Sequence, residues 1–347
     1  MKKRRVLTVL IMAALLAFSF FVIFAGNTKD EKEGGVIRVW KGPHTGDDAA
    51  VFADVIAAFE AEHPGATVEY TPTPWDTIIE KYTTAFASGN PPDIIYAFTG
   101  GYVDGVVGQC YDLREIYDDE GFAYLKKGVA DSLLAETTVD GKLVAIPYFT
   151  AGASFVYNID LLKDAGFDRP PDTIEELVEY AKAMTKDLDG DGKIDQYGYG
   201  LLSYDTAEAK PDFNMGVSKL PQGPGKGLAE GRGTYAGSGF WSIAEATKHL
   251  ELAKDFVLKL YDPEFQKPIA MAFGFIPSNT NIKMDLEPIP KAFADVSLNY
   301  GVPYRFGPHV NEVKEAVWRA MQGLQSGAVG PEDAWEQAVS EGKAALQ

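Results

Sequence analysis

Residues Gly141–Gly166, GKLVAIPYFTAGASFVYNIDLLKDAG, decide the fold of this chain. Two strand-like runs, Leu143–Pro147 and Ser154–Tyr157, flank a turn of aromatic and small residues. Asn158 then opens a short helix that ends at Ala165–Gly166. The stretch contains no recognisable catalytic acid, base or nucleophile motif. We therefore predict that it is a crossing between two structural units.

The chain begins with a basic segment, MKKRR, and a long apolar run, Val6–Ala25, broken only by Thr8 and Ser19. This pattern is typical of an export signal, and a run of about 20 residues is also long enough for a retained membrane anchor. Ala25–Gly26 is a poor cleavage site because Ile23 is not small, so cleavage and anchoring both stay open. No cysteine follows the run to carry a lipid.

The composition limits the classes of partner. The formal net charge of −18 repels nucleic acid and anionic lipid headgroups. A single cysteine, Cys110, excludes an intrachain disulfide, and no zinc-ligand spacing is present. A chain of 347 residues is too large for one ordinary core, which favours two lobes.

After the N-terminal segment, strand and helix patterns alternate. This order predicts an α/β fold with a parallel sheet covered on both faces. Ligands bind beyond the carboxyl ends of such strands, and we call this the strand-end rule. The segments at those ends are 40–45, which contains His44, 72–75, which ends at Trp75, and 98–102. In order, the predicted strands and helices are strand Val36–Trp40, helix Ala49–Glu62, strand Thr67–Tyr70, helix Trp75–Ser88 and strand Asp93–Phe98.

We predict five segments. Residues 1–25 are a signal peptide or anchor, 26–35 a tether and 36–145 an N-terminal lobe. Residues 146–260 form a shortened C-terminal lobe, and 261–347 are C-terminal helices that return across both lobes. Within these, Thr173 and Glu176 form a capping box for a helix to about Thr185.

Six blocks in a fixed order carry a family likeness: IRVWKG, ASGNPPDIIYAF, the crossing, FNMGVSKLP, AGSGFWSIAEATKHLELAKDFVLKL and GFIPSN. With the export signal, they resemble the extracellular solute-binding proteins of bacterial sugar ABC transporters, a group that includes the maltose-binding proteins. The resemblance implies a two-lobe periplasmic-binding-protein fold of type II that closes on a carbohydrate by a hinge motion. It also implies delivery to a membrane permease from a periplasmic or extracellular position, as a monomer, without enzymatic activity and without a required cofactor.

The chain departs from the family pattern in its second lobe. Where the family has a long stretch with several helices, only Leu201–Asp212 joins Tyr199 to Phe213. The ligand site on that side is therefore expected to be incomplete. The alternative function is a shortened relative that binds no sugar and acts as an interaction protein, or has no function.

A sugar presents apolar faces and a rim of hydroxyls, so its site needs aromatic platforms and a few fixed polar groups. Trp241 follows Gly237-Ser238-Gly239, which we expect to form a turn, whereas Trp318 and Trp335 lie on amphipathic helices and are expected in the core. For each aromatic candidate, core packing is the alternative role. The candidate sugar-binding residues are Trp40, His44, Trp75, Tyr96, Tyr148, Tyr157 and Trp241.

The loop 187–195, DLDGDGKID, resembles the start of an EF-hand calcium loop. Gly198 stands where the bidentate glutamate would be, so another carboxylate would have to complete the site. A solvated Asp/Gly turn is the alternative. The candidate Ca²⁺ ligands are Asp187, Asp189, Asp191, Lys193 and Asp195.

Catalytic patterns are weak. None of the histidines, His44, His63, His249 and His309, lies near a serine or cysteine in a recognisable nucleophile motif. A glycan hydrolase would need two carboxyl groups about 5–10 Å apart across the cleft. The sequence does not single out such a pair among its 50 acidic residues.

Overall fold

The computed structural model describes residues 34–98, 107–200, 213–222, 234–303 and 310–346. The predicted export signal or anchor lies outside these ranges, as do nearly all of the tether and the connection Leu201–Asp212. Among helices of the described ranges, none combines the length and the apolar character that a membrane-spanning segment requires.

The first part of the chain folds as the alternation of strand and helix predicts. Strand β1 pairs in parallel with both β2 and β3. Asp47 accepts a hydrogen bond from the Ala50 N–H at 3.1 Å and so caps the first helix. The elements are β1 (Gly35–Lys41), α2 (Asp48–Glu62), β2 (Ala66–Pro72), α3 (Ile78–Ala87) and β3 (Ile94–Phe98).

The sheet continues beyond residue 145, where the N-terminal lobe was expected to end. Strands β6 (Ile146–Gly152) and β9 (Thr234–Ile243) join it in the order β10-β6-β9-β3-β1-β2, and β11 pairs with β9. Strand β9 runs antiparallel to both β3 and β6, so the sheet is mixed rather than parallel. The two short strands are β10 (Ile276–Pro277) and β11 (Gly301–Pro303).

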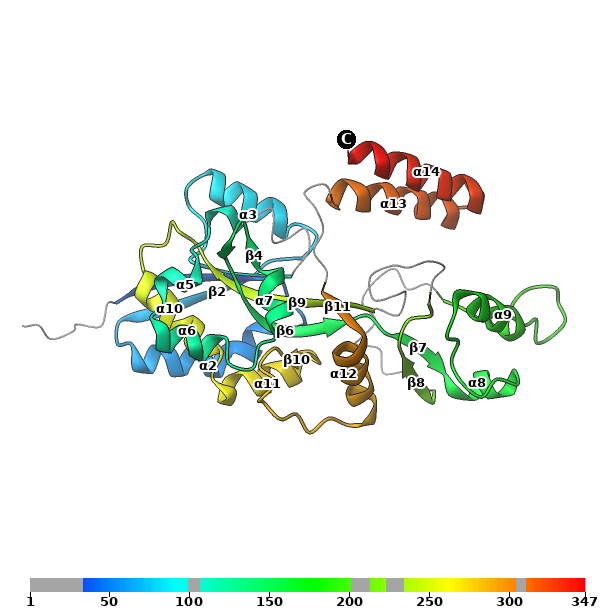
Figure 1. Ribbon diagram of the computed structural model, residues 1–347, viewed down its shortest axis with the longest axis horizontal. Coiled ribbons are helices and arrows are strands. Elements are labelled where there is room, and N and C mark those ends of the chain that lie inside the picture. Colours follow the sequence, from blue (N-terminus) through cyan, green and yellow to red (C-terminus); the bar gives the residue numbers. More distant parts are fainter. Residues whose placement is uncertain (1–33, 99–106, 201–212, 223–233, 304–309, 347) are drawn as a thin grey trace, which may run out of the picture.

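Helices pack on this sheet and close its core (Figure 1). Phe59 of α2 contacts Phe256 of α10 with ring centroids 5.1 Å apart. Helix α10 (Leu250–Leu260) therefore packs with the first lobe, although residues to 260 were assigned to the second. Other elements of this lobe are η1 (Val107–Gln109), α5 (Leu113–Ile116), α6 (Asp119–Leu125), α7 (Asp131–Glu136), β4 (Thr138–Val139), β5 (Lys142–Leu143) and α11 (Pro263–Phe273).

A smaller unit extends to one side of the sheet in Figure 1. Its strands β7 (Phe155–Asn158) and β8 (Met215–Ser218) pair antiparallel, and α8 (Ile159–Asp164) and α9 (Ile174–Met184) flank them. The predicted capping residue Thr173 accepts a hydrogen bond from the Glu176 N–H at 3.1 Å. The Glu176 carboxylate accepts from the Asp172 N–H at 2.8 Å, one residue before the position that a capping box uses.

Three helices end the chain: α12 (Pro288–Tyr300), α13 (Val310–Gln325) and α14 (Pro331–Ala345). Helices α13 and α14 form an antiparallel hairpin that stands apart from the sheet in Figure 1. The expectation that Trp318 and Trp335 are core residues is wrong, since 37% and 71% of their surfaces are exposed. Their helices are amphipathic, but the apolar stripe of the hairpin is only partly covered.

Candidate functional site

Six rings meet at the carboxyl end of β1 and β3. We call His44, Trp75, Tyr96, Phe98, Phe273 and Phe275 the ring cluster. The imidazole of His44 lies at its centre, with ring centroids 5.3 Å from Trp75 and 4.8 Å from Phe275. All of these rings except Tyr96 are partly exposed, so the cluster presents aromatic surface at the edge of the sheet.

Four separate parts of the chain supply the ring cluster. His44 follows β1, Trp75 follows β2, and Tyr96 and Phe98 lie in β3. Phe273 ends α11, and Phe275 stands just before β10, with Gly274 as the helix C-cap between them. The strand-end rule therefore placed the His44 and Trp75 segments correctly at the same edge.

The indole of Trp75 is held in a fixed orientation. Its Nε1–H donates a hydrogen bond to the Pro43 carbonyl at 2.7 Å. The ring also lies directly against Gly42, where a Cβ atom would stand only 2.2 Å from the Trp75 ring. Only glycine at position 42 allows the indole to approach the end of β1 so closely.

A buried ion pair lies beneath the rings. The Lys41 ammonium donates a short hydrogen bond to the Asp48 carboxylate, and both side chains are closed to solvent. Asp48 also accepts from the N–H groups of His44 and Thr45 at 2.7 and 2.8 Å and from the Tyr70 hydroxyl at 3.1 Å. With these partners, the carboxylate fixes the loop that carries His44.

The Lys41 ammonium is also surrounded by aromatic faces. Its Nζ lies 4.4 Å from the ring centroid of Phe273 and 5.1 Å from that of Tyr96. Cation–π attraction at these distances compensates part of the cost of burying the charge. The ion pair thus ties the sheet to the end of α11.

Burial sets the protonation of these groups. It lowers the pKa of Lys41 to about 8, against the raising influence of Asp48. Burial, together with the charge of Lys41, lowers the pKa of His44 to about 3. Burial acts to raise the pKa of Asp48, but the charge and hydrogen bonds of Lys41 hold it below the ordinary value. At neutral pH His44 is therefore a neutral imidazole, with Nε2 3.3 Å from the Tyr96 hydroxyl oxygen.

Three predicted platforms lie in the core instead of at a surface. Tyr96, Tyr148 and Trp241 are each fully buried. Trp241 packs on Tyr96 and Tyr148, with centroids 4.8 and 5.9 Å apart. The expectation that Trp241 follows a turn is wrong, because Gly237, Ser238 and Gly239 are residues of strand β9. A ring with no exposed face in this structure cannot receive a ligand there.

Two further candidates lie away from the ring cluster. Trp40 is in β1 and stacks on Tyr82 of α3, with centroids 6.2 Å apart and planes 18° from parallel. Tyr157 is in β7 of the smaller unit and stacks on Phe155 at 6.3 Å. Of the seven candidates, the structure brings together His44, Trp75 and Tyr96 in the ring cluster, and Tyr96 links them to Trp241 and Tyr148 in the core.

Sequence reasoning did not single out Lys41, Phe273 or Phe275. A lysine at the end of a strand usually reaches solvent, so its burial depends on Asp48 and on rings from distant parts of the chain. Phe275 belongs to the GFIPSN block, which was noted for its family likeness alone. The two phenylalanines on either side of Gly274 were the one local pattern that could have indicated an aromatic site there.

The predicted calcium loop forms an exposed turn closed by its own side chains. Oxygens of Asp187, Asp189 and Asp195 lie within 4.8 Å of one another. Asp187 accepts hydrogen bonds from the N–H groups of Gly190 and Gly192, and Lys193 pairs with Asp191 at 3.1 Å. Calcium binding here stays a prediction, which a calorimetric titration with Ca²⁺ would test.

The chain is similar to known binding proteins. The sequence profile of the bacterial extracellular solute-binding proteins matches residues 42–267. A protein of Brucella abortus named as a binding protein is 30% identical over 169 residues, which are 49% of this chain and 39% of that protein. The diacetylchitobiose binding protein DasA of Streptomyces coelicolor is 30% identical over 148 residues, which are 40% of this chain and 32% of that protein. The chain thus spans well under two thirds of the length of these relatives.

Solved structures confirm the predicted two-lobe fold. CpMnBP1 with mannotriose bound matches with a TM-score of 0.71 and 20% identity, over 88% of this chain and 99% of that one. The maltodextrin-binding domain MalE of Bdellovibrio bacteriovorus, bound to maltotriose, matches with a TM-score of 0.65 and 20% identity, over 90% and 100%. Together with a profile match over more than half of its length, this shows that the chain belongs to the family of bacterial extracellular solute-binding proteins.

Proposed function

We propose that the chain binds a carbohydrate on the ring cluster and serves as the binding component of an ABC-type sugar uptake system. The observation that carries the proposal is the set of partly exposed rings, led by Trp75, at the carboxyl end of the parallel strands. Flat aromatic surfaces suit the apolar faces of a sugar. The neutral imidazole of His44 adds a polar atom that can exchange hydrogen bonds with a hydroxyl.

The known relatives support a sugar as the ligand. One similar protein is named for diacetylchitobiose, and similar structures hold mannotriose and maltotriose. In this chain, the smaller unit with Tyr157 would close over a bound sugar by a hinge motion at β6 and β9. We propose that the closed form is recognised by permease subunits, and that the protein acts as a monomer outside the cytoplasm, with residues 6–25 as an export signal or a tether.

We propose binding without catalysis. The carboxylate beneath the rings, Asp48, is already bonded to Lys41, Tyr70 and two backbone N–H groups. A carboxylate held in this way is not free to act as a general acid or nucleophile. The family and the fold are those of binding proteins, which agrees with this proposal.

A thermal-shift screen over mono- and oligosaccharides tests the proposal. A ligand at 100 times its dissociation constant stabilises the folded state by about 2.7 kcal/mol, which raises the melting temperature measurably. Calorimetry then gives the affinity of each sugar that causes a rise. The absence of any rise over a panel that includes manno-, malto- and chito-oligosaccharides would contradict sugar binding. It would favour the alternative, a shortened relative that acts through protein contacts.

A further inference from the structure

The ring cluster has few polar atoms, and most of them are already paired. They are the two imidazole nitrogens of His44, the Nε1 of Trp75 and the hydroxyl oxygen of Tyr96. The Trp75 Nε1–H donates to the Pro43 carbonyl at 2.7 Å, and the Tyr96 hydroxyl lies 3.3 Å from His44 Nε2. His44 Nδ1 has no hydrogen-bond partner among the described residues, and it is not one of the buried polar atoms that lack a partner. It is therefore open to the surface.

The hydrogen bond between Tyr96 and His44 fixes the position of the imidazole proton. Burial raises the pKa of the Tyr96 hydroxyl well above its ordinary value, so this hydroxyl keeps its proton at neutral pH. A buried hydroxyl proton needs an acceptor, and His44 Nε2 is the one that the described residues provide. The neutral imidazole therefore accepts at Nε2 and carries its own proton on Nδ1, which makes Nδ1 a donor.

This donor lies in aromatic surroundings. Ring centroids lie 4.8, 5.1, 5.3 and 5.5 Å from the imidazole centroid, namely those of Phe275, Phe273, Trp75 and Phe98. A ligand atom that reaches Nδ1 from the surface therefore brings its neighbouring atoms into contact with these rings. The ligand group that fits is a hydrogen-bond acceptor attached to an apolar carbon.

The arrangement distinguishes a carbonyl from a hydroxyl. A sugar hydroxyl that accepts from Nδ1–H also brings a proton of its own, and the described ring cluster has no unpaired side-chain acceptor to receive it. Leaving such a proton unpaired on burial is unfavourable. A carbonyl oxygen only accepts, so it uses the donor without this cost.

The cluster offers no free charge to an ionic ligand. Lys41 is the cation beneath its rings, and it is closed to solvent and paired with Asp48. In the described ranges, no other lysine or arginine lies at cation–π distance over a ring of the cluster. The net charge of −18 also repels an anion, so a carboxylate oxygen is a poorer acceptor for this site than a neutral carbonyl.

We propose that the ring cluster recognises the acetamido group of an N-acetylated sugar. The carbonyl oxygen of that group accepts a hydrogen bond from His44 Nδ1–H, and its methyl group lies against the surrounding rings. The sugar hydroxyls stay at the rim, toward water. Tyr96 is a positioning residue, which acts through the proton of His44. The site is the one that the proposed function gives to a carbohydrate, so this assignment rests on that function.

Calorimetry with three disaccharides of the same β-linked backbone tests the proposal. Diacetylchitobiose carries acetamido groups, cellobiose carries hydroxyls at the same positions, and cellobiuronic acid carries one carboxylate. We expect diacetylchitobiose to bind at least about tenfold more tightly than cellobiose, because it alone offers a neutral carbonyl. We expect cellobiuronic acid to bind no more tightly than cellobiose.

The outcomes separate this assignment from the proposed function. Equal affinities of diacetylchitobiose and cellobiose would overturn the assignment and leave sugar binding intact. Binding of another sugar of the screen without binding of diacetylchitobiose would do the same. Tightest binding of cellobiuronic acid would overturn it in favour of a carboxylate ligand. If no sugar bound at all, the proposed function would be contradicted as well.

Three variants separate the donor from the aromatic surface. His44→Phe keeps a ring and removes the donor, so the preference for diacetylchitobiose over cellobiose should fall toward equality. His44→Gln keeps an N–H donor and should retain part of the preference. Tyr96→Phe lets the imidazole carry its proton on either nitrogen and should lower the preference without abolishing it. An unchanged preference in His44→Phe would contradict the role of Nδ1.

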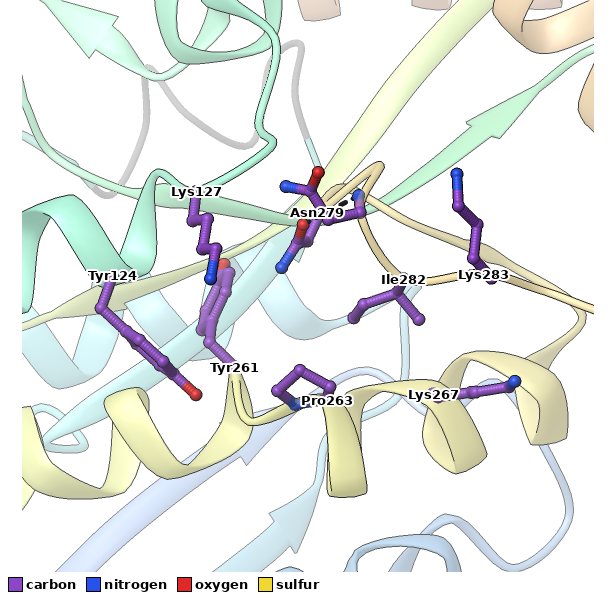
Figure 2. A pocket seen from close by; sticks show the side chains of 9 residues that line it. Tyr124, Lys127, Tyr261, Pro263, Lys267, Asn279, Ile282 and Lys283 are labelled. Atoms are coloured by element: carbon purple, nitrogen blue, oxygen red, sulfur yellow. Dashed lines mark hydrogen bonds between the residues drawn. The ribbon is translucent and has the colours of Figure 1, made fainter.

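A hollow away from the ring cluster supplies the control position. Its volume is about 450 Å³, and it lies between the end of α6, the junction of α10 and α11, and the loop after β10 (Figure 2). Its lining includes Tyr124 and Asn279 but no residue of the ring cluster. Tyr124→Ala should therefore leave the affinity for diacetylchitobiose unchanged. Loss of affinity in Tyr124→Ala, with none in His44→Phe, would move the sugar to this hollow and overturn the assignment.

NMR of the unmodified protein gives a measurement that needs no stable variant. Long-range proton–nitrogen correlation spectra of the imidazoles report which ring nitrogen carries the proton. For His44 we expect the proton on Nδ1 at neutral pH, and a shift of the Nδ1 resonance when diacetylchitobiose is added. A proton on Nε2, or no shift at saturation with the sugar, would show that Nδ1–H is not the donor.

Discussion

The side chains of Lys41 and Asp48 form an ion pair that is closed to solvent and lies beneath the ring cluster. Lys41 ends β1, whereas Asp48 begins α2, so the pair joins a strand to the helix that follows it. Its other contacts extend to Tyr70 of β2 and to Phe273 of α11. The geometry of the proposed sugar site therefore depends on one buried charge pair.

Replacing Lys41 with methionine should lower the free energy of unfolding by about 3–5 kcal/mol, because Asp48 is left as an uncompensated buried charge. The double variant Lys41→Met, Asp48→Asn should recover part of that loss, since the asparagine oxygen can still accept from the N–H groups of His44 and Thr45. Urea unfolding followed by circular dichroism measures both. A double variant no more stable than the single one would show that the charge of Asp48 is not the cause.

Replacing Trp75 with alanine should weaken binding of the sugar found in the screen by about 1–2 kcal/mol, the scale of a lost aromatic contact. Isothermal calorimetry measures the affinity. The control is Trp335→Ala on α14, a tryptophan that is 71% exposed and lies outside the ring cluster. Unchanged affinity in Trp75→Ala, with the fold intact, would remove Trp75 from the proposed site.

Replacing Trp241 with alanine should act on stability. The side chain is fully buried between Tyr96 and Tyr148, and loss of such a core ring costs about 3–5 kcal/mol. Thermal unfolding of the variant measures the loss. A variant with wild-type stability but weaker sugar binding would restore the role that the sequence had suggested for Trp241.

The pKa of His44 predicts a dependence of stability on pH. Its pKa is about 3 in the folded protein and 6.5 in an ordinary environment, so between these values the unfolded chain binds more protons. The contribution of His44 is therefore complete above pH 6.5 and is lost as the pH falls toward 3. Urea unfolding at several pH values should show a smaller decline for His44→Gln than for the wild type. If the unfolding free energies of His44→Gln and the wild type declined equally as the pH falls, a neutral, buried His44 would be contradicted.

The sequence predicted the elements whose signals are local. The apolar residues of α2 recur at helical spacing, and Asp47 and His63 mark its two ends. The strand-end rule brought His44 and Trp75 to one edge before any distance was known. Both predictions needed only neighbours along the chain and one general property of parallel sheets.

The wrong prediction for Trp241 has a physical cause in a distant part of the chain. Gly237, Ser238 and Gly239 have the composition of a turn but belong to a central strand. Glycine is needed at position 239 because a Cβ there would stand 1.9 Å from the Tyr96 hydroxyl oxygen. Trp241 then continues the strand into the core. Local composition could not reveal a ring that approaches from β3.

The pairing of Gly152 with Ala236 gives β6 and β9 a role beyond the sheet itself. The chain leaves the sheet at the end of one strand and re-enters it at the start of the adjacent one, so the smaller unit is topologically an insertion in a β-hairpin. The entropy of closing a loop changes slowly with its length, by about 0.6 kcal/mol for each doubling. Evolution can therefore shorten or extend this insertion while the sheet, the Lys41–Asp48 pair and the ring cluster keep their geometry.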